Sequence, residues 1–334
     1  MNSMISRAAA VAAVFALAPS AALACACGCG VFDIGSGGMM PTDSTSPLTV
    51  WFRYDEMNQN QNWEGGSKAP AADNSDKRIE TSFYTVGGQY MVNHSWTVMA
   101  ELPLYDRALT TTDDGSVFGA AGSIYTGRLT ALGDLQLSVV YTGLSADMST
   151  GLGLGVKLPT GDFTGPKGPL GGAEFDRDSL PGTGTTDLIL SAYHVGRLNA
   201  AGSLSYFVQG RYQFAIGSRD GYRPGNEFDS AAGVTYNFGK VGMLDKVAPV
   251  IQLLNSYRDH DSGVAADPPN SGYERLLIAP GVDLRLNKVH LYADVEIPLY
   301  QHANAAEGEA AVVDGTSGQL VASVLYKLRV AYDF

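Results

Sequence analysis

Apolar and polar residues alternate along most of this chain, from about residue 47 to the last residue. In 320–334 the apolar and aromatic residues fall on one face, and Lys327, Arg329 and Asp333 fall on the other. A period of two residues places neighbouring side chains on opposite faces of a β-strand. The pattern therefore predicts an all-β protein whose strands each have one apolar and one polar face.

Twelve segments show this alternation, and the links between them follow a rule. Short links of two to seven residues alternate with long links rich in Gly, Asp, Ser, Thr and Pro. An even number of strands of about ten residues, with tight turns at one end and long loops at the other, is typical of a transmembrane antiparallel β-barrel. The predicted strands are 47–56, 79–92, 95–106, 133–146, 151–160, 185–197, 202–216, 227–239, 247–258, 273–286, 289–300 and 320–334, and the long links are 57–78, 107–132, 161–184, 217–226, 259–272 and 301–319.

A water-soluble β-sandwich or lipocalin-like barrel would also alternate, with its apolar face turned inward. The polar faces here carry too many charges for a dry core. The chain also ends in Tyr-Asp-Phe, which resembles the C-terminal signal of bacterial outer-membrane barrels. Aromatic residues lie near the strand ends, as in the girdles of membrane barrels; they are Tyr54, Trp96, Tyr141, Tyr257, Tyr300 and Tyr326. These features favour the membrane barrel.

The chain divides into three parts. Residues 1–24 have the features of a secretory signal peptide, because Arg7 precedes an apolar run and Ala22-Leu23-Ala24 has the form of a cleavage site. Residues 25–46 form a Cys- and Gly-rich segment, which we interpret either as a periplasmic leader or as a plug inside the barrel. Residues 47–334 are the predicted barrel. The net charge of −12 argues against nucleic acid as a partner.

Assigning faces by alternation places equal numbers of acidic and basic residues in the lumen. Charges in a narrow bore are costly unless they are paired, so salt bridges that hold the barrel rigid are one role for them. Contact with a passing solute is the other possible role of these charges. The equal number of positive and negative residues predicts weak ion selectivity. The predicted lumen residues are Arg53, Lys157, Arg211, Arg258, Arg275, Arg285, Lys327 and Arg329, with Asp55, Glu101, Asp187, Asp229, Asp283, Asp294, Glu296 and Asp333.

From Gly133 onward the chain resembles the outer-membrane family named after the meta-cleavage pathway of phenol degradation. The stretches that carry the resemblance are GDLQLSVVY (133–141), GLGLGVKLPTGD (151–162), GTGTTDLILSAYHVGRLN (182–199) and GYRPGNEFDSAAGVTYNF (221–238). The region that contains them, 133–238, covers about a third of the chain. The resemblance implies a porin-like barrel with a periplasmic N-terminus and a role in passage of small, often apolar, molecules. It supplies no catalytic motif, and the cysteines lie outside it.

All three cysteines lie in one C-x-C-x-C run, at Cys25, Cys27 and Cys29. Thiolates are soft ligands that suit Cu, Zn or a chalcogen species, and Met39 and Met40 could add thioether ligands. Two alternatives stay open. Export to an oxidising compartment favours a disulfide or a link to a partner chain, and Cys25 could instead be acylated. The spacing is not that of a covalent haem site.

The remaining motifs predict no enzyme. GLGLG at 151–155 lies within a strand, Asp176 and Asp178 do not complete a calcium loop, and the five histidines are scattered. We therefore predict a bacterial outer-membrane channel for a small solute, in contact with membrane lipid and with its N-terminus in the periplasm. The alternative is a non-conducting scaffold barrel that binds a periplasmic partner protein, such as an electron-transfer component.

Overall fold

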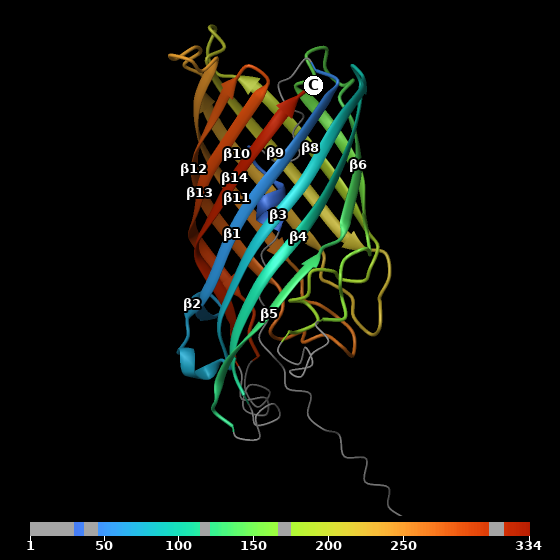
Figure 1. The fold of residues 1–334 in the computed structure, drawn as a ribbon, viewed down its shortest axis with the longest axis vertical. Helices are drawn as coiled ribbons and strands as arrows, with labels where there is room; N and C mark the ends of the chain where they lie inside the picture. Colours follow the sequence, from blue (N-terminus) through green and yellow to red (C-terminus); the bar gives the residue numbers. More distant parts are fainter. Residues whose placement is uncertain (1–29, 37–45, 114–120, 166–174, 307–316) are drawn as a thin grey trace, which may run out of the picture.

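The strands form one closed antiparallel β-barrel (Figure 1). The computed structural model describes residues 30–36, 46–113, 121–165, 175–306 and 317–334. The elements are η1 (Gly30–Asp33), β1 (Leu48–Glu64), β2 (Ser67–Lys68), η2 (Ala71–Asp73), β3 (Asp76–Asn93), β4 (Trp96–Thr112), β5 (Ile124–Leu132), β6 (Leu135–Tyr141), β7 (Thr150–Leu158), β8 (Asp187–Arg197), β9 (Leu204–Ala215), β10 (Glu227–Tyr236), β11 (Lys246–Arg258), β12 (Tyr273–Leu286), β13 (Val289–Ala303) and β14 (Gln319–Asp333). Within these ranges no helix is long and apolar enough to cross a membrane.

Closure of the barrel joins the first long strand to the last. Successive strands pair along the chain, and β14 pairs with β1 from Thr49–Asp333 to Trp63–Gln319. The two short strands β5 and β6 lie end to end beside β4, so together they occupy one position in the wall. With β2 a two-residue extension beside β1, the wall has twelve strand positions, as the sequence predicts.

The two ends of the barrel differ. Tight turns such as Asn93–Trp96 and Leu286–Val289 lie at the end where the chain finishes, which we call the short-turn end (Figure 1). The connections at the opposite end are longer, and we call it the long-loop end. Among the described residues, this end carries 159–165, 175–186, 216–226 and 259–272.

The side chains of β14 show how the barrel faces its surroundings. Tyr326, Leu328 and Tyr332 are exposed on the outside, each by more than 40%. Lys327 and Arg329, which alternate with them, point inward and are 2% and 7% exposed. A water-soluble barrel would have the opposite arrangement, because water solvates charges and not a belt of aromatic and aliphatic side chains. The predicted transmembrane barrel is confirmed.

Several strands extend further than the alternation predicts. β1 continues to Glu64 through Asn58–Asn62, and β4 continues to Thr112, both inside segments predicted as long links. These extensions carry polar residues on both faces, so apolar alternation does not mark them. They nevertheless pair with neighbouring strands, for example at Asn58–Glu80 and Thr111–Asp76. The predicted link 107–132 is wrong, because it contains the last part of β4 and all of β5.

The wall is interrupted between β5 and β6. β7 pairs with β6 from Leu158–Leu135 onward and does not reach β5. The loop after β7 lies against this place instead, with the Asp162 N–H donating to the Leu132 carbonyl at 3.1 Å. Three glycines allow the contact, because a Cβ on Gly161 would come within 2.7 Å of the Gly133 carbonyl carbon, and one on Gly182 within 2.5 Å of that of Gly161.

Candidate functional site in the barrel bore

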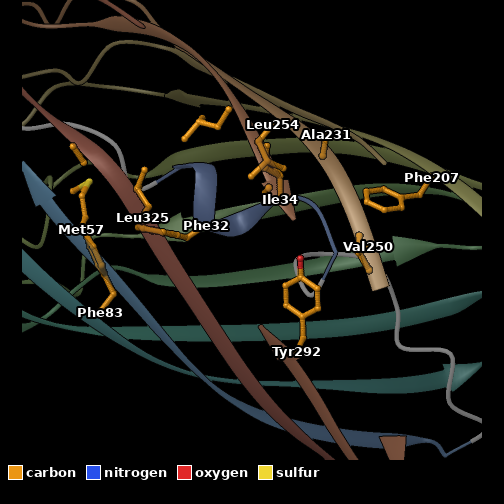
Figure 2. Close-up of a cluster of buried hydrophobic side chains, with 13 residues drawn as sticks. Phe32, Ile34, Met57, Phe83, Phe207, Ala231, Val250, Leu254, Tyr292 and Leu325 are labelled. Carbon is orange, nitrogen blue, oxygen red and sulfur yellow. The ribbon is translucent and has the colours of Figure 1, made fainter. Parts of the chain in front are cut away.

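Residues 30–36, which we call the inner segment, lie inside the barrel at mid-height (Figure 1). Phe32 and Ile34 are 1% and 0% exposed. They pack against an apolar ring on the inner wall, from which Figure 2 labels Met57, Phe83, Phe207, Ala231, Val250, Leu254, Tyr292 and Leu325. Burying two such side chains stabilises the packed state by about 3–6 kcal/mol. The described part of the Cys- and Gly-rich region is therefore held within the bore.

Polar side chains of the wall satisfy the backbone of the inner segment. The Gly35 N–H donates to Gln209 Oε1 at 2.8 Å, and the Ser36 N–H donates to Gln252 Oε1 at 2.9 Å. Lys327 Nζ donates to the Ile34 carbonyl at 3.3 Å. Gly35 has a φ of +81°, and a Cβ there would lie 2.6 Å from Gln252 Oε1, so glycine is required. A segment without regular structure needs such partners when it is buried.

Asp33 anchors the inner segment through two arginines from different strands. Its carboxylate lies 2.9 Å from Arg53 Nη2 on β1 and 3.6 Å from Arg211 Nη2 on β9, and accepts a hydrogen bond from Gln136 at 3.3 Å. Burial by itself would raise the pKa of Asp33. The two guanidinium groups outweigh that effect and hold the pKa below its ordinary value. Asp33 is therefore charged at neutral pH.

A second charged group lies beside the inner segment. Lys327 Nζ is 3.2 Å from Glu296 Oε1, and both side chains are fully buried. Asp294 is near enough to contribute to the same electrostatic balance, and its Oδ2 accepts hydrogen bonds from Tyr292 at 2.7 Å and Gln252 at 3.0 Å. Since Gln252 also holds Ser36, the network joins β11, β13 and β14 to the inner segment.

A cavity of about 140 Å³ lies between the inner segment and the long loops. Phe32 and Asp33 line it on the side of the inner segment, and Leu180, Pro181 and Tyr222 line it on the side of the loops. Its walls carry both charges and rings. A cavity of about this volume holds a molecule of the size of benzene. The bore can thus accept a small molecule between the two layers that narrow it.

The loops above the cavity are tied together through Asp261. Its carboxylate accepts hydrogen bonds from Tyr222 at 2.8 Å, from Arg258 at 2.6 Å and from the Gly225 N–H at 2.7 Å. Burial raises the pKa of Tyr222 well above its usual range, so it stays a donor. Burial, with the nearby carboxylate of Asp261, also raises the pKa of Asp178 to about 7. The long-loop end is therefore covered by packed loops.

The predicted lumen residues lie together in the barrel. Twelve of the sixteen are buried, and Glu101, Arg258, Asp283 and Arg285 are half-buried. Many form ion pairs, among them Arg53–Asp55 at 2.7 Å, Lys157–Asp187 at 3.1 Å and Arg211–Asp229 at 3.2 Å. Those that line the cavity are Arg53, Glu101, Lys157, Asp187, Arg211 and Arg258. Their contact with a solute stays a prediction.

The cysteines and the two methionines predicted as metal ligands lie outside the described residues, so Cys25, Cys27, Cys29, Met39 and Met40 have no structural account. Among the residues that are described, no three His, Cys, Asp or Glu side chains gather closely enough to hold a metal ion. Binding of Cu or Zn at the thiols therefore stays a prediction.

Sequence reasoning missed the inner wall's apolar ring and its glutamines. Gln136, Gln209 and Gln252 are inward-facing polar residues, yet without a view of the inner segment nothing marks them as its partners. The apolar ring does leave a signal. Stretches such as 253–254 and 276–279 have apolar residues on both faces, which breaks the alternation. A residue from such a run that faces the bore needs an apolar partner there.

Comparison with solved structures gives the fold. An outer membrane channel from Pseudomonas putida F1 superimposes with a TM-score of 0.61 at 14% identity, over 89% of this chain and 100% of the other. The toluene transporter TbuX from Ralstonia pickettii gives 0.42 at 10% identity over 87% and 90% of the two chains. The β domain of the Bordetella autotransporter BrkA gives 0.44 at 13% identity over 86% and 100%.

No protein-family model matches the chain, and neither does any curated protein. At 14% identity, the likeness to the Pseudomonas channel shows the architecture and not the activity. The chain has the fold of a bacterial outer-membrane channel. The two weaker likenesses carry no inference about function.

Proposed function

We propose that the protein is a channel of the bacterial outer membrane that lets a small solute cross, with its short-turn end and N-terminus in the periplasm. The observation that supports this function is a charged bore that is narrowed by a segment of the same chain and contains a cavity of about 140 Å³. A barrel that served as a scaffold would need no polar cavity. Its inner wall could be filled by side chains alone.

The inner segment sets the size of solute that fits. It is held by side chains of the wall through non-covalent contacts, so it can shift without breaking the barrel. The apolar ring that receives Phe32 and Ile34 would be exposed to the bore after such a shift. Rings and aliphatic side chains next to paired charges suit a small solute that has both an apolar and a polar part.

Flux into liposomes tests this function on the full-length protein. We expect proteoliposomes to admit small neutral solutes faster than protein-free liposomes, and to exclude large sugars. Solutes with a ring and one polar group are expected to pass faster than sugars of the same mass. Flux equal to that of protein-free liposomes, for every solute tried and also without the inner segment, would leave the scaffold as the better description.

We further propose that Cys25, Cys27 and Cys29 bind a soft species such as Cu or Zn ions or a chalcogen compound, or link the barrel to a periplasmic partner such as an electron carrier. The supporting observation is their place in the chain, since Cys29 is directly followed by Gly30, the first residue of the segment held in the bore. Metal-binding cysteines at these positions would be directly connected, through the backbone, to the inner segment that narrows the channel.

Metal content separates binding from the alternatives. Protein purified from the outer membrane is expected to carry more Cu or Zn than a variant with all three cysteines changed to serine. A variant with Met39 and Met40 changed to leucine reports whether thioethers contribute. Equal metal content in wild type and serine variant would remove the binding proposal, and a mass shift of Cys25 would show acylation instead.

A further inference from the structure

Five cationic side chains line the cavity, and one of them differs from the rest. Four have a carboxylate partner, at 2.9 Å for Arg53–Asp33, 2.8 Å for Lys157–Asp134, 3.2 Å for Arg211–Asp229 and 2.6 Å for Arg258–Asp261. The fifth is Arg107. No carboxylate oxygen of the described residues lies within 4.0 Å of its guanidinium nitrogens. An unpaired buried cation is costly, so its presence calls for an explanation.

Arg107 is held in place by neutral groups. It lies on β4 and is 2% exposed. Its Nε donates to Thr81 Oγ1 at 2.9 Å, its Nη1 donates to the Ser179 carbonyl, and its guanidinium carbon lies 5.7 Å from the centre of the Tyr105 ring. These bonds use two of the five N–H donors of a guanidinium group. The side chain is thus oriented. Among the described residues its charge has no carboxylate partner, and three of its N–H donors have no acceptor, so they can bind a ligand in the cavity it lines.

An aromatic wall runs from Arg107 toward the inner segment. The Tyr105 ring lies 4.9 Å from that of Phe83 in an edge-on arrangement, and the Phe83 ring lies 5.3 Å from that of Phe32. All three rings line the cavity. The Thr85 hydroxyl, two residues further along β3, also lines it, and is buried without a hydrogen-bond partner among the described residues. The cavity therefore offers a cation, a row of three aromatic rings and a hydroxyl that has no partner among the described residues.

We propose that Arg107 binds the carboxylate of a small aromatic acid, whose ring packs on Tyr105 and Phe83. A guanidinium fork matches a carboxylate in geometry and charge. The cavity volume of about 140 Å³ limits the body of the ligand to one ring. Inorganic phosphate or acetate would satisfy the charge but leave the aromatic wall without a partner. This proposal rests on the proposed channel function, because a bound aromatic acid is a transported solute only if the barrel conducts.

Two carboxylates also line the cavity and have no ion pair within 4.0 Å in the part of the chain that the structure describes. Glu227 interacts electrostatically with Arg211 and Arg258, so its charge is balanced. Asp178 lies next to Ser179, the residue that orients Arg107. With a pKa raised to about 7 by burial and by Asp261, it is protonated in part of the population at neutral pH. Removing the negative charge of Asp178 should therefore strengthen the binding of an anion to Arg107.

Calorimetry on the full-length protein in detergent micelles tests the site, with sodium benzoate as the probe. We expect benzoate to bind about 10- to 100-fold more tightly than benzamide, which has the same shape and no charge. Sodium acetate is expected to bind more weakly than benzoate, since it lacks the ring. Benzoate that binds no better than benzamide, or no better than acetate, would overturn the proposal.

Variants assign the charge to Arg107. Arg107→Gln is expected to lower benzoate affinity to the level of benzamide, and Arg107→Lys to keep part of the difference. Arg78→Gln is the matched control, because Arg78 lies on the exposed surface of β3 with 47% of its side chain accessible. Asp178→Asn, which leaves Arg107 intact, is expected to tighten benzoate binding and covers the case in which Arg107→Gln does not fold. Unchanged affinity in Arg107→Lys and Arg107→Gln, or weaker binding in Asp178→Asn, would contradict the assignment.

The binding proposal and the channel proposal can be disproved independently of each other. Benzoate binding without flux into liposomes would overturn the channel and leave the site. Flux without benzoate binding would overturn the site and leave the channel.

Discussion

Deletion of residues 30–36 is expected to raise the single-channel conductance of the protein several-fold. The inner segment occupies the bore at mid-height, where Phe32 and Ile34 are almost fully buried against the wall. Removing it leaves a barrel of twelve strand positions whose bore is wide enough for water and ions. Planar-bilayer recording of the deleted and full-length proteins at equal salt concentration measures the change.

Point variants separate the segment's two kinds of contact. Phe32→Ala with Ile34→Ala removes the apolar contacts and keeps the chain length, so it should give brief openings of the size seen in the deletion. Asp33→Asn removes the ion pairs with Arg53 and Arg211 and should do the same less often. Tyr90→Ala with Val92→Ala, two residues on the outer face of β3, is the matched control and should not alter conductance. A deletion variant that conducts no more than the full-length protein would contradict the account.

Changing Lys327 to methionine is expected to lower the free energy of unfolding by about 3–5 kcal/mol. Its ammonium group lies 3.2 Å from Glu296 Oε1, and neither side chain is exposed. Without Lys327, the buried carboxylate of Glu296 has no counter-charge within 4.0 Å among the described residues, and Asp294 and Asp55 add to the same negative potential. The hydrogen bond to the Ile34 carbonyl is lost as well. Urea unfolding in detergent micelles, followed by tryptophan fluorescence, measures the difference.

The double variant Lys327→Met with Glu296→Gln should recover most of the loss, because the fully buried Glu296 carboxylate no longer carries a charge without its partner. Lys246→Met is the control for an ion pair near solvent. Lys246 and Asp283 are 2.8 Å apart, but about a quarter of each side chain is exposed, so a loss below about 1 kcal/mol is expected. If Lys327→Met were as mild as Lys246→Met, the buried pair would not contribute to stability as described.

Much of the barrel follows from the sequence because a bilayer imposes a simple rule. Outward-facing side chains must be apolar, so Leu328 and Tyr332 alternate with Lys327 and Arg329 in β14, and the alternation identifies both strand and face. This rule does not apply where a strand extends beyond the apolar region of the bilayer. Asn58–Asn62 and Thr110–Thr112 continue their strands with polar residues on both faces, and alternation of apolar and polar residues does not detect them.

The site was less accessible to sequence reasoning, for a physical reason. The charges of the lumen can be assigned to a face from alternation, but their partners depend on register around the barrel. Arg53 on β1 and Arg211 on β9 are far apart in sequence, and both form ion pairs with Asp33. Asp33 belongs to the inner segment, which has no apolar periodicity that would predict its place. That Arg107 has no carboxylate partner among the described residues is likewise visible only in the folded structure.

The closing seam of the barrel has a consequence for the order of assembly. β1 and β14 pair residues as far apart as Thr49 and Asp333, so the wall cannot close until the last strand has been made and delivered. Contacts of such long sequence separation form slowly, because the connecting chain must lose much of its freedom first. The inner segment precedes β1 and is surrounded by strands from all parts of the chain. A sheet that is still open can curl around this segment, whereas a closed barrel would have to admit Phe32 and Ile34 through one end. We therefore expect the inner segment to guide the pairing of the last strands during assembly. A barrel made without this segment is expected to close more slowly.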